Sequence, residues 1–138
     1  MTKMAYQIDE ARDICRYCVI FDKNENANVF FSYKATMRDL HVMAVEVELG
    51  KKDVDECLEE VRKGLVYSMR LGDTFVMNID NLALDFKNKW TDDEVFPMEL
   101  ISDFDDWRES ENYMKIVKEE ENVDLIGNKK CYQMAETF

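Results

Sequence analysis

The chain of 138 residues contains a single proline, Pro97, and only four glycines. Proline and glycine are the residues that most often interrupt helices and strands, so their scarcity indicates regular elements joined by short connections. No internal repeat, low-complexity tract or Gly/Pro/Ser-rich linker divides the sequence. We therefore expect one domain over residues 1–138, either on its own or as a fragment or subunit of a larger assembly.

Positive charge is also scarce, because 18 basic residues stand against 30 acidic ones, a formal net charge of -12. A chain this acidic is repelled by phosphate backbones and anionic membrane surfaces, so neither nucleic acid nor a membrane is an expected partner. No stretch approaches the roughly 20 apolar residues that span a bilayer. The first residues, MTKMAYQIDEARD, are too polar for a signal peptide. The sequence therefore predicts a cytoplasmic protein.

The clearest predicted element is a helix over residues 53–71, DVDECLEEVRKGLVYSMRL. Asp53 and Glu56 have the spacing of a capping box, apolar residues recur at helical spacing, and Gly72 follows as a stop. The next stretch, TFVMNI at residues 74–79, is typical of a buried strand. A helix, a tight turn and a strand form the second half of a βαβ unit, and RYCVIFD at residues 16–22 is the predicted first strand. We expect an α/β fold with a small, mainly parallel sheet flanked by helices.

The remaining segments give weaker patterns. Residues 28–52 carry a helical stripe that favours a helix through about His41, whereas VEVEL, within the same segment, alternates as a strand would. Pro97 restricts residues 90–104 to one short helix or a turn and a helix. Another helix is expected around Tyr113, and CYQMAETF, residues 131–138, is a candidate strand at the sheet edge.

Asp22 and Asp80 each follow a predicted strand, the position at which open α/β sheets place ligands. A carboxylate there coordinates Mg²⁺ in nucleoside triphosphatases, so one hypothesis is a Mg²⁺-dependent nucleotide- or phosphate-handling enzyme that uses both residues. Such a site also needs a phosphate-binding loop, and no G-x-x-x-x-G-K-[ST] motif occurs. The absence of the loop favours the alternative that the two aspartates cap or terminate strands.

Residues 22–33, DKNENANVFFSY, also approximate a calcium-binding loop. Asp22, Asn24 and Asn26 occupy the first, third and fifth positions, but Ala27 replaces the glycine of the sixth and Tyr33 the glutamate of the twelfth. This pattern supports the alternative of a mainly α, degenerate EF-hand-like regulatory protein with very weak calcium affinity.

The four cysteines and the single histidine offer little chemistry. Cys15 and Cys18 form a C-x-x-C, but they enter a predicted strand and not a helix N-terminus, where a redox pair would have a lowered pKa. Cys57, Cys131 and His41 lack the paired spacing of a zinc site. We interpret the cysteines as buried apolar residues and expect no cofactor.

Acidic and aromatic residues alternate in the C-terminal third, in DFDDWRESEN at residues 103–112. This segment is either the solvated face of a helix or a protein interface, since exposed aromatic residues beside acids are typical of interfaces. The predicted contacts for a protein partner with a basic surface are Trp90, Phe104, Asp105, Asp106, Trp107 and Tyr113.

The order CVIFDKN, FFSYK, VYSMRLGDTFVMNID, LDFKNKW and LIGNKKCYQM resembles a P-loop-type α/β domain that lacks the phosphate loop. The resemblance covers residues 16–134, and such domains occur in large eukaryotic scaffold proteins, including proteins of cilia and flagella. It implies a non-catalytic role, with Asp80 as a relic, and a cytoplasmic setting such as a cilium, an axoneme or the cytoskeleton. The leading functional prediction is a non-catalytic, acidic interaction or structural module; the enzyme and the EF-hand-like protein are the alternatives.

Overall fold

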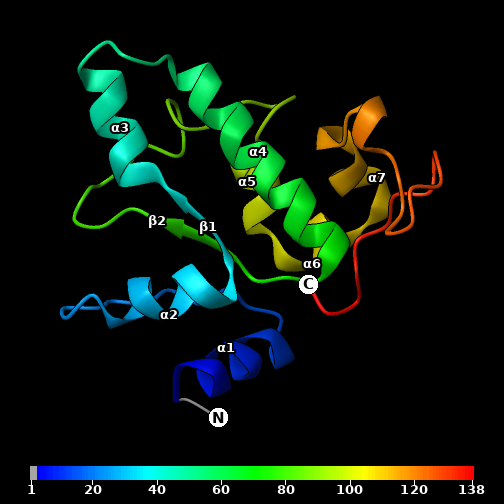
Figure 1. Cartoon of the computed structure of the whole chain (residues 1–138), viewed down its shortest axis with the longest axis horizontal. Helices are drawn as coiled ribbons and strands as arrows, with labels where there is room; N and C mark the ends of the chain where they lie inside the picture. Colours follow the sequence, from blue (N-terminus) through cyan, green and yellow to red (C-terminus); the bar gives the residue numbers. More distant parts are fainter. Residues whose placement is uncertain (1–2) are drawn as a thin grey trace.

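The structure, a computed structural model, describes residues 3–138. It is a mainly helical α/β fold with a small two-stranded sheet (Figure 1). In chain order the elements are α1 (Lys3–Asp13), α2 (Asn26–Lys34), β1 (Thr36–Asp39), α3 (Leu40–Glu48), α4 (Val54–Leu71), β2 (Phe75–Asn78), α5 (Met98–Ser102), α6 (Phe104–Arg108), α7 (Ser110–Tyr113) and the 3-10 helices η1 (Met114–Ile116) and η2 (Glu119–Glu121).

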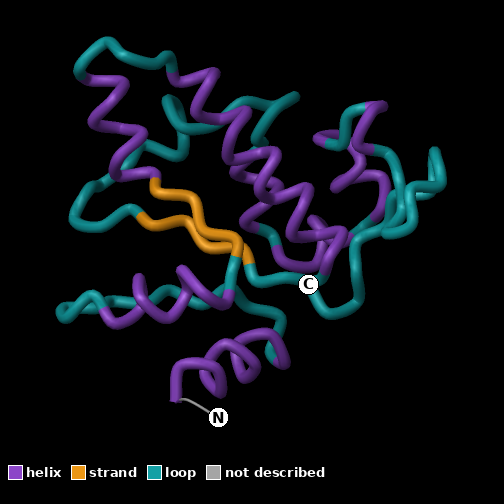
Figure 2. Tube along the Cα trace, in the orientation of Figure 1, coloured by secondary structure: helices purple, strands orange, loops and turns teal. Residues whose placement is uncertain are grey.

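The two strands are parallel, with Thr36 opposite Phe75 and Asp39 opposite Asn78. They lie near the centre of the molecule in Figure 2, and the connection between them runs through α3 and α4. Helix α4 packs against both strands, and α2 packs against β1. The predicted small, parallel sheet flanked by helices is thus confirmed in its general form.

Helix α4 forms as the sequence predicts. The backbone N–H of Asp53 donates to the Glu56 carboxylate at 3.1 Å, and Gly72 ends the helix with a left-handed φ of 71°. In other residues this conformation brings the Cβ too close to a backbone carbonyl oxygen, and glycine fits here because it has no Cβ. The predicted apolar stripe is the buried face: Cys57, Leu58, Val61, Leu65 and Met69.

The prediction of a first strand at residues 16–22 is wrong. These residues lie outside helices and strands, in the connection between α1 and α2, and β1 takes their place in the sheet. The backbone N–H of Thr36 donates to the carbonyl of Thr74, and the Thr36 hydroxyl donates to Asp73, so both contacts fix β1 beside the start of β2. Pairing with a neighbouring strand, and not strand propensity alone, selects the strand.

The continuous helix predicted through His41 is also wrong, because β1 separates α2 from α3. Asp39 ends the strand and caps α3 by accepting the backbone N–H of Val42 at 3.2 Å. The VEVE residues of VEVEL belong to α3, so its alternation does not make a strand. Residues 16–21, directly before Asp22, are not helical, and the helix-loop-helix of the EF-hand alternative is therefore not formed.

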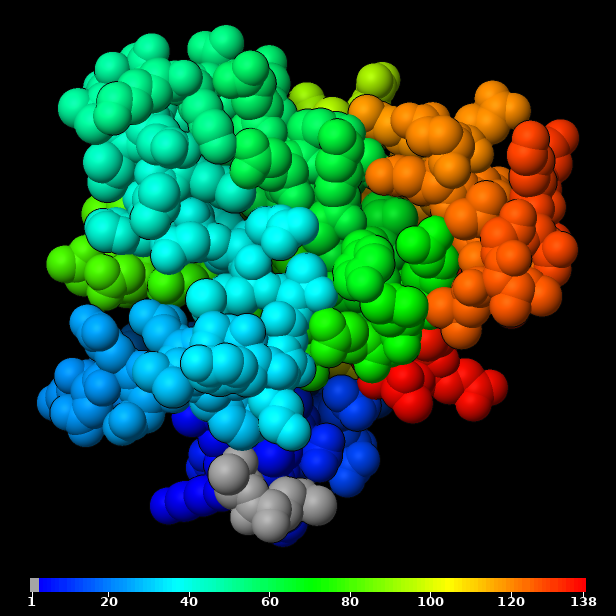
Figure 3. All heavy atoms as spheres, in the orientation of Figure 1, coloured from blue at the N-terminus to red at the C-terminus, as the bar shows by residue number. Residues whose placement is uncertain are grey.

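In the C-terminal third, α5 directly follows Pro97 as expected, and Tyr113 ends α7. The edge strand predicted at residues 131–138 is wrong, since that segment is neither helix nor strand. It packs on α4 instead, where the Tyr132 hydroxyl donates to the Val66 carbonyl at 2.7 Å and the Ala135 N–H donates to the Met69 carbonyl. Figure 3 shows the C-terminal residues, in red, beside the green surface of α4.

The core lies between α4 and the C-terminal third. One cluster of buried side chains combines α3, α4 and residues 90–132, including Trp90, Phe96, Trp107, Ile116 and Tyr132. Helix α1 has no buried residue among those described. The aromatic C-terminal third therefore supplies much of the apolar cover of α4.

Candidate protein-interaction surface

Three of the four aromatic residues predicted at a partner surface are buried in the core. Trp107 has an exposed fraction of 0%, Trp90 of 3% and Tyr113 of 7%. The sequence-based expectation that they are exposed beside the acids is thus corrected. The large apolar face of α4 needs cover, and these rings provide it together with Phe96 and Tyr132.

Phe104 is the only one of the four that is half-buried. The Arg108 guanidinium lies 3.5 Å from its ring centroid, and the Tyr17 ring centroid lies 5.2 Å from it. Arg108 also donates to the backbone carbonyl of Phe138 at 2.9 Å. The one basic side chain of α6 is therefore used within the protein.

The acidic members of the prediction, Asp105 and Asp106, are exposed in the first turn of α6. Carboxylates are favoured at this end of a helix. Asp103 precedes them and caps α6 by accepting the Asp106 N–H at 3.1 Å. We use the name acidic α5–α7 segment for the exposed carboxylates that these three helices and their caps carry: Glu99, Asp103, Asp105, Asp106, Glu109 and Glu111.

An exposed apolar stretch connects α1 to α2. Residues 14–21, ICRYCVIF, form this apolar linker, in which Val19 is 77% and Phe21 is 94% exposed. Tyr17 places the linker beside α6 through its contact with Phe104. Contiguous exposed apolar residues of this kind mark interaction sites in folded proteins. A strand-like pattern in residues 16–22 signalled this segment in the sequence, but it indicated burial and not exposure.

The sequence-based expectation that the cysteines are buried holds only for one of the four. Cys57 is buried in α4, where burial raises its thiol pKa, but Cys15, Cys18 and Cys131 are exposed. Within residues 3–138 no group of three or more His, Cys, Asp or Glu side chains is placed to hold a metal ion.

Asp22 and Asp80 both have partners inside the protein. The Asp22 carboxylate accepts the backbone N–H groups of Ala27 and Asn24, which lower its pKa, so it caps the start of α2. Asp80 follows β2 with a left-handed φ of 48°, and its carboxylate lies 3.9 Å from Nδ1 of His41. The structure thus gives Asp22 a capping role, whereas a metal site at the two residues stays a prediction.

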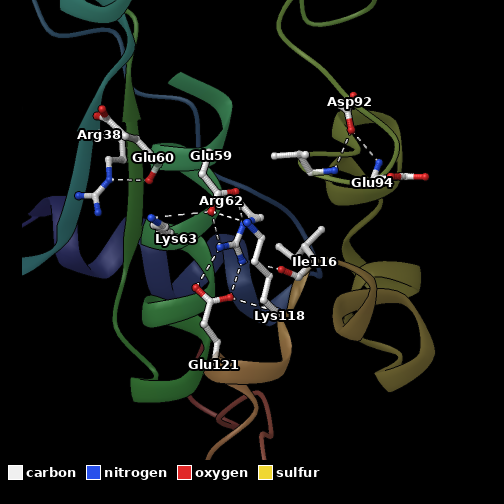
Figure 4. A network of polar contacts seen from close by, with 11 residues as sticks. Arg38, Glu59, Glu60, Arg62, Lys63, Asp92, Glu94, Ile116, Lys118 and Glu121 are labelled. Atoms are coloured by element: carbon white, nitrogen blue, oxygen red, sulfur yellow. Dashed lines mark hydrogen bonds and ion pairs between the residues drawn. The ribbon is translucent and has the colours of Figure 1, made fainter. Parts of the chain in front are cut away.

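Arg62 is a buried charge that the sequence analysis missed. Figure 4 shows its guanidinium between the carboxylates of Glu59 and Glu121, with Lys118 close to both acids. Arg62 also donates to the backbone carbonyl of Ile116 at 2.6 Å. Its position on the buried side of the α4 stripe, among Leu58, Val61 and Leu65, was the available signal. The network joins α4 to η1 and η2 and therefore holds residues 114–121 against the central helix.

Two hollows lie on the surface that the structure describes. The larger, about 370 Å³, is lined by Glu119, Glu120, Val123, Lys129 and Lys130, and the smaller, about 190 Å³, lies between α1 and α2. Neither lining combines a nucleophile with a histidine base. None of the helices in the described residues is both long and apolar enough to cross a membrane.

No known protein family, curated protein or solved structure matches this chain.

Proposed function

We propose that this protein is a non-catalytic, acidic interaction module that binds a protein partner with a basic surface. The observation that carries the proposal is the acidic α5–α7 segment, in which six carboxylates are exposed on three consecutive helices and their caps. The only basic residue among residues 98–113 is Arg108, and its guanidinium is already stacked on Phe104. The segment therefore presents nearly uncompensated negative charge.

The helices that carry these charges are anchored to the core. Trp107 of α6 and Tyr113 of α7 are buried, and Asp103 caps α6. Charged groups on ordered helices lose little conformational freedom when a partner binds, which favours affinity. The net charge of -12 would also speed the approach of a basic partner and repel acidic ones.

The role of the predicted aromatic residues changes accordingly. Trp90, Trp107 and Tyr113 support the surface from beneath, and Asp105 and Asp106 are the proposed contacts. Phe104 lies at the boundary between the acidic α5–α7 segment and the apolar linker. The cytoplasmic setting, with a cilium or the cytoskeleton as its narrower form, stays a prediction from the sequence.

The test places a photo-crosslinking amino acid at Asp106 and, as a control, at Glu120 of η2. Both positions are exposed acids in the first turn of a short helix. In cell extract, we expect adducts at position 106 with a protein that has a basic surface, and few at position 120. The adducts should decrease as salt is raised, because screening weakens contacts between exposed charges.

Charge removal then tests the same contact with the purified partner. Asp105→Asn/Asp106→Asn should weaken binding by about tenfold, the effect of losing about 1.4 kcal/mol. Glu119→Gln/Glu120→Gln removes the same charge from another site and should change binding by less than about twofold. Equal effects of the two double substitutions would mean that only net charge matters, and would contradict the proposed site.

A further inference from the structure

The apolar linker exposes its backbone as well as its side chains. Within the described residues, no protein group forms a hydrogen bond with the backbone N–H or carbonyl groups of residues 17–21. The side chains there, YCVIF, are those of a strand former. Unpaired backbone groups beside strand-forming side chains are a template for a strand from another molecule.

We infer that two copies of this chain pair through residues 16–22, RYCVIFD, as antiparallel strands with Val19 opposite Val19 of the second copy. This inference does not depend on the acidic α5–α7 segment. Its basis is the order of these seven residues, named here the pairing segment. Read from either end, the segment has a charged, an aromatic and an apolar residue before Val19 at its centre, and its two end charges have opposite signs. Tyr17 would face Phe21 of the second copy, Cys18 would face Ile20, and Arg16 would face Asp22.

The end charges select both the direction and the register of pairing. Arg16 and Asp22 are exposed, and the Arg16 side chain has no partner among the described residues. Antiparallel pairing about Val19 forms the Arg16–Asp22 pair twice, whereas parallel pairing in register would set Arg16 beside Arg16. A shift by one residue sets Arg16 opposite Lys23 or Phe21, so both ion pairs are lost. Opposite charges across strands stabilise a pair, and like charges destabilise it.

The pairing segment is held in place by the rest of the protein. An isolated two-stranded ribbon is only marginally stable in water. Here α1 and α2 hold the two ends, Asp22 caps α2, and the Tyr17 ring lies against Phe104. These attachments reduce the conformational freedom that pairing must remove. Tyr17, Val19 and Phe21 would share one face of the ribbon, next to α6, because alternate residues of a strand point the same way.

Disulfide trapping tests the register. We would replace Cys15, Cys18 and Cys131 with serine, keep the buried Cys57, and add either Val19→Cys or Ile20→Cys. Residues directly opposite in an antiparallel pair have Cα atoms about 4.5–5.5 Å apart, within disulfide reach. We expect Val19→Cys to give a disulfide-linked dimer on mild oxidation and Ile20→Cys to give little, since two copies of residue 20 would lie diagonally. Equal yields, or no dimer from either variant, would overturn the inference.

Sedimentation equilibrium of the unmodified full chain tests pairing without a crosslink. We expect a monomer–dimer equilibrium that Val19→Pro/Ile20→Pro abolishes, while Val19→Ala/Ile20→Ala retains it. Neighbouring residues of a strand direct their N–H groups to opposite edges, so one of the two prolines removes a hydrogen bond between the copies. Arg16→Glu should weaken the dimer by about tenfold, because two favourable charge pairs become repulsive. A wild-type chain that stays monomeric at every concentration, or dimers that Val19→Pro/Ile20→Pro leaves unchanged, would refute it. Asp105→Asn/Asp106→Asn should not change the dimer, so the proposed function and this inference can fail separately.

Discussion

The Arg62 guanidinium of α4 meets the carboxylate of Glu121 with two of its nitrogens, and Nη2 lies 3.0 Å from Oε1. The Arg62 side chain is 1% exposed, and Glu121 is 22% exposed at the edge of the same site. Planar, bidentate pairing of this kind is specific to arginine. The contact joins two segments 59 residues apart, so the network holds η2 to the central helix.

Removing the buried charge should destabilise the fold. Arg62→Met leaves Glu59 and Glu121 without their main partner, and we expect the free energy of unfolding in urea to fall by about 2–4 kcal/mol. The control is Lys63→Met, which removes an exposed ion pair with the same Glu59 and should change stability by less than about 0.5 kcal/mol. Equal losses in the two variants would show that the buried geometry is unimportant.

The same network should make stability depend on pH. Hydrogen bonds from Arg62 lower the pKa of Glu59 from 4.5 to about 2. Burial raises the pKa of Glu121 and is the largest single influence, but the hydrogen bonds from Arg62 and from the Lys118 N–H, together with the charge of Arg62, lower it by more, so the net shift of the Glu121 pKa is downward. Because the folded-state pKa values lie below the unfolded ones, the stabilisation is present above about pH 4.5 and is lost as the pH falls toward 2.

Urea unfolding at pH 6 and at pH 2.5 checks this dependence. Wild type should be more stable than Glu59→Gln at pH 6, and the gap should narrow at pH 2.5. A gap that is the same at both pH values would exclude Glu59 as a source of the pH dependence.

Gly72→Ala should lower stability more than Gly50→Ala. Both glycines have a left-handed φ, 71° and 66°, so alanine costs about 1 kcal/mol at either position for the backbone alone. At Gly72 an added Cβ would also overlap Oγ1 of Thr137, whereas at Gly50 nothing lies within 4 Å. We expect a further loss of about 1 kcal/mol at Gly72, seen as a lower Tm; similar Tm values would mean that the C-terminal residues move aside freely.

Trp107→Ala should act on the fold. Trp107 is fully buried in the core, so its removal should lower the free energy of unfolding by about 3–5 kcal/mol. Asp105→Asn, two positions earlier on the exposed side of α6, should change it by less than about 0.5 kcal/mol. A Trp107→Ala variant with wild-type stability would return Trp107 to the surface as a candidate partner contact.

Local sequence patterns determined the central helix and the strand that follows it. Helix α4 depends on interactions within a few residues: its apolar stripe, the hydrogen bond from the Asp53 N–H to Glu56, and Gly72 at its end. Strand β2 lies inside residues 74–79, as predicted. The acidic residues of the C-terminal third likewise indicated that Asp105 and Asp106 are exposed. Interactions of this range can be predicted from a single sequence because both partners belong to the same stretch of chain.

Only the tertiary structure decided which segments pair and which side chains are buried. Residues 16–22 have the stronger strand pattern, but Thr36–Asp39 lies beside β2 and forms the sheet with it. The aromatic rings of Trp90, Trp107 and Tyr113 pack in the core with α4. Arg62 pairs with Glu121, which lies 59 residues further along the chain. Each outcome depends on contacts between distant segments. Hydrophobic burial and charge pairing favour such contacts without specifying, in the local sequence, where the partner lies.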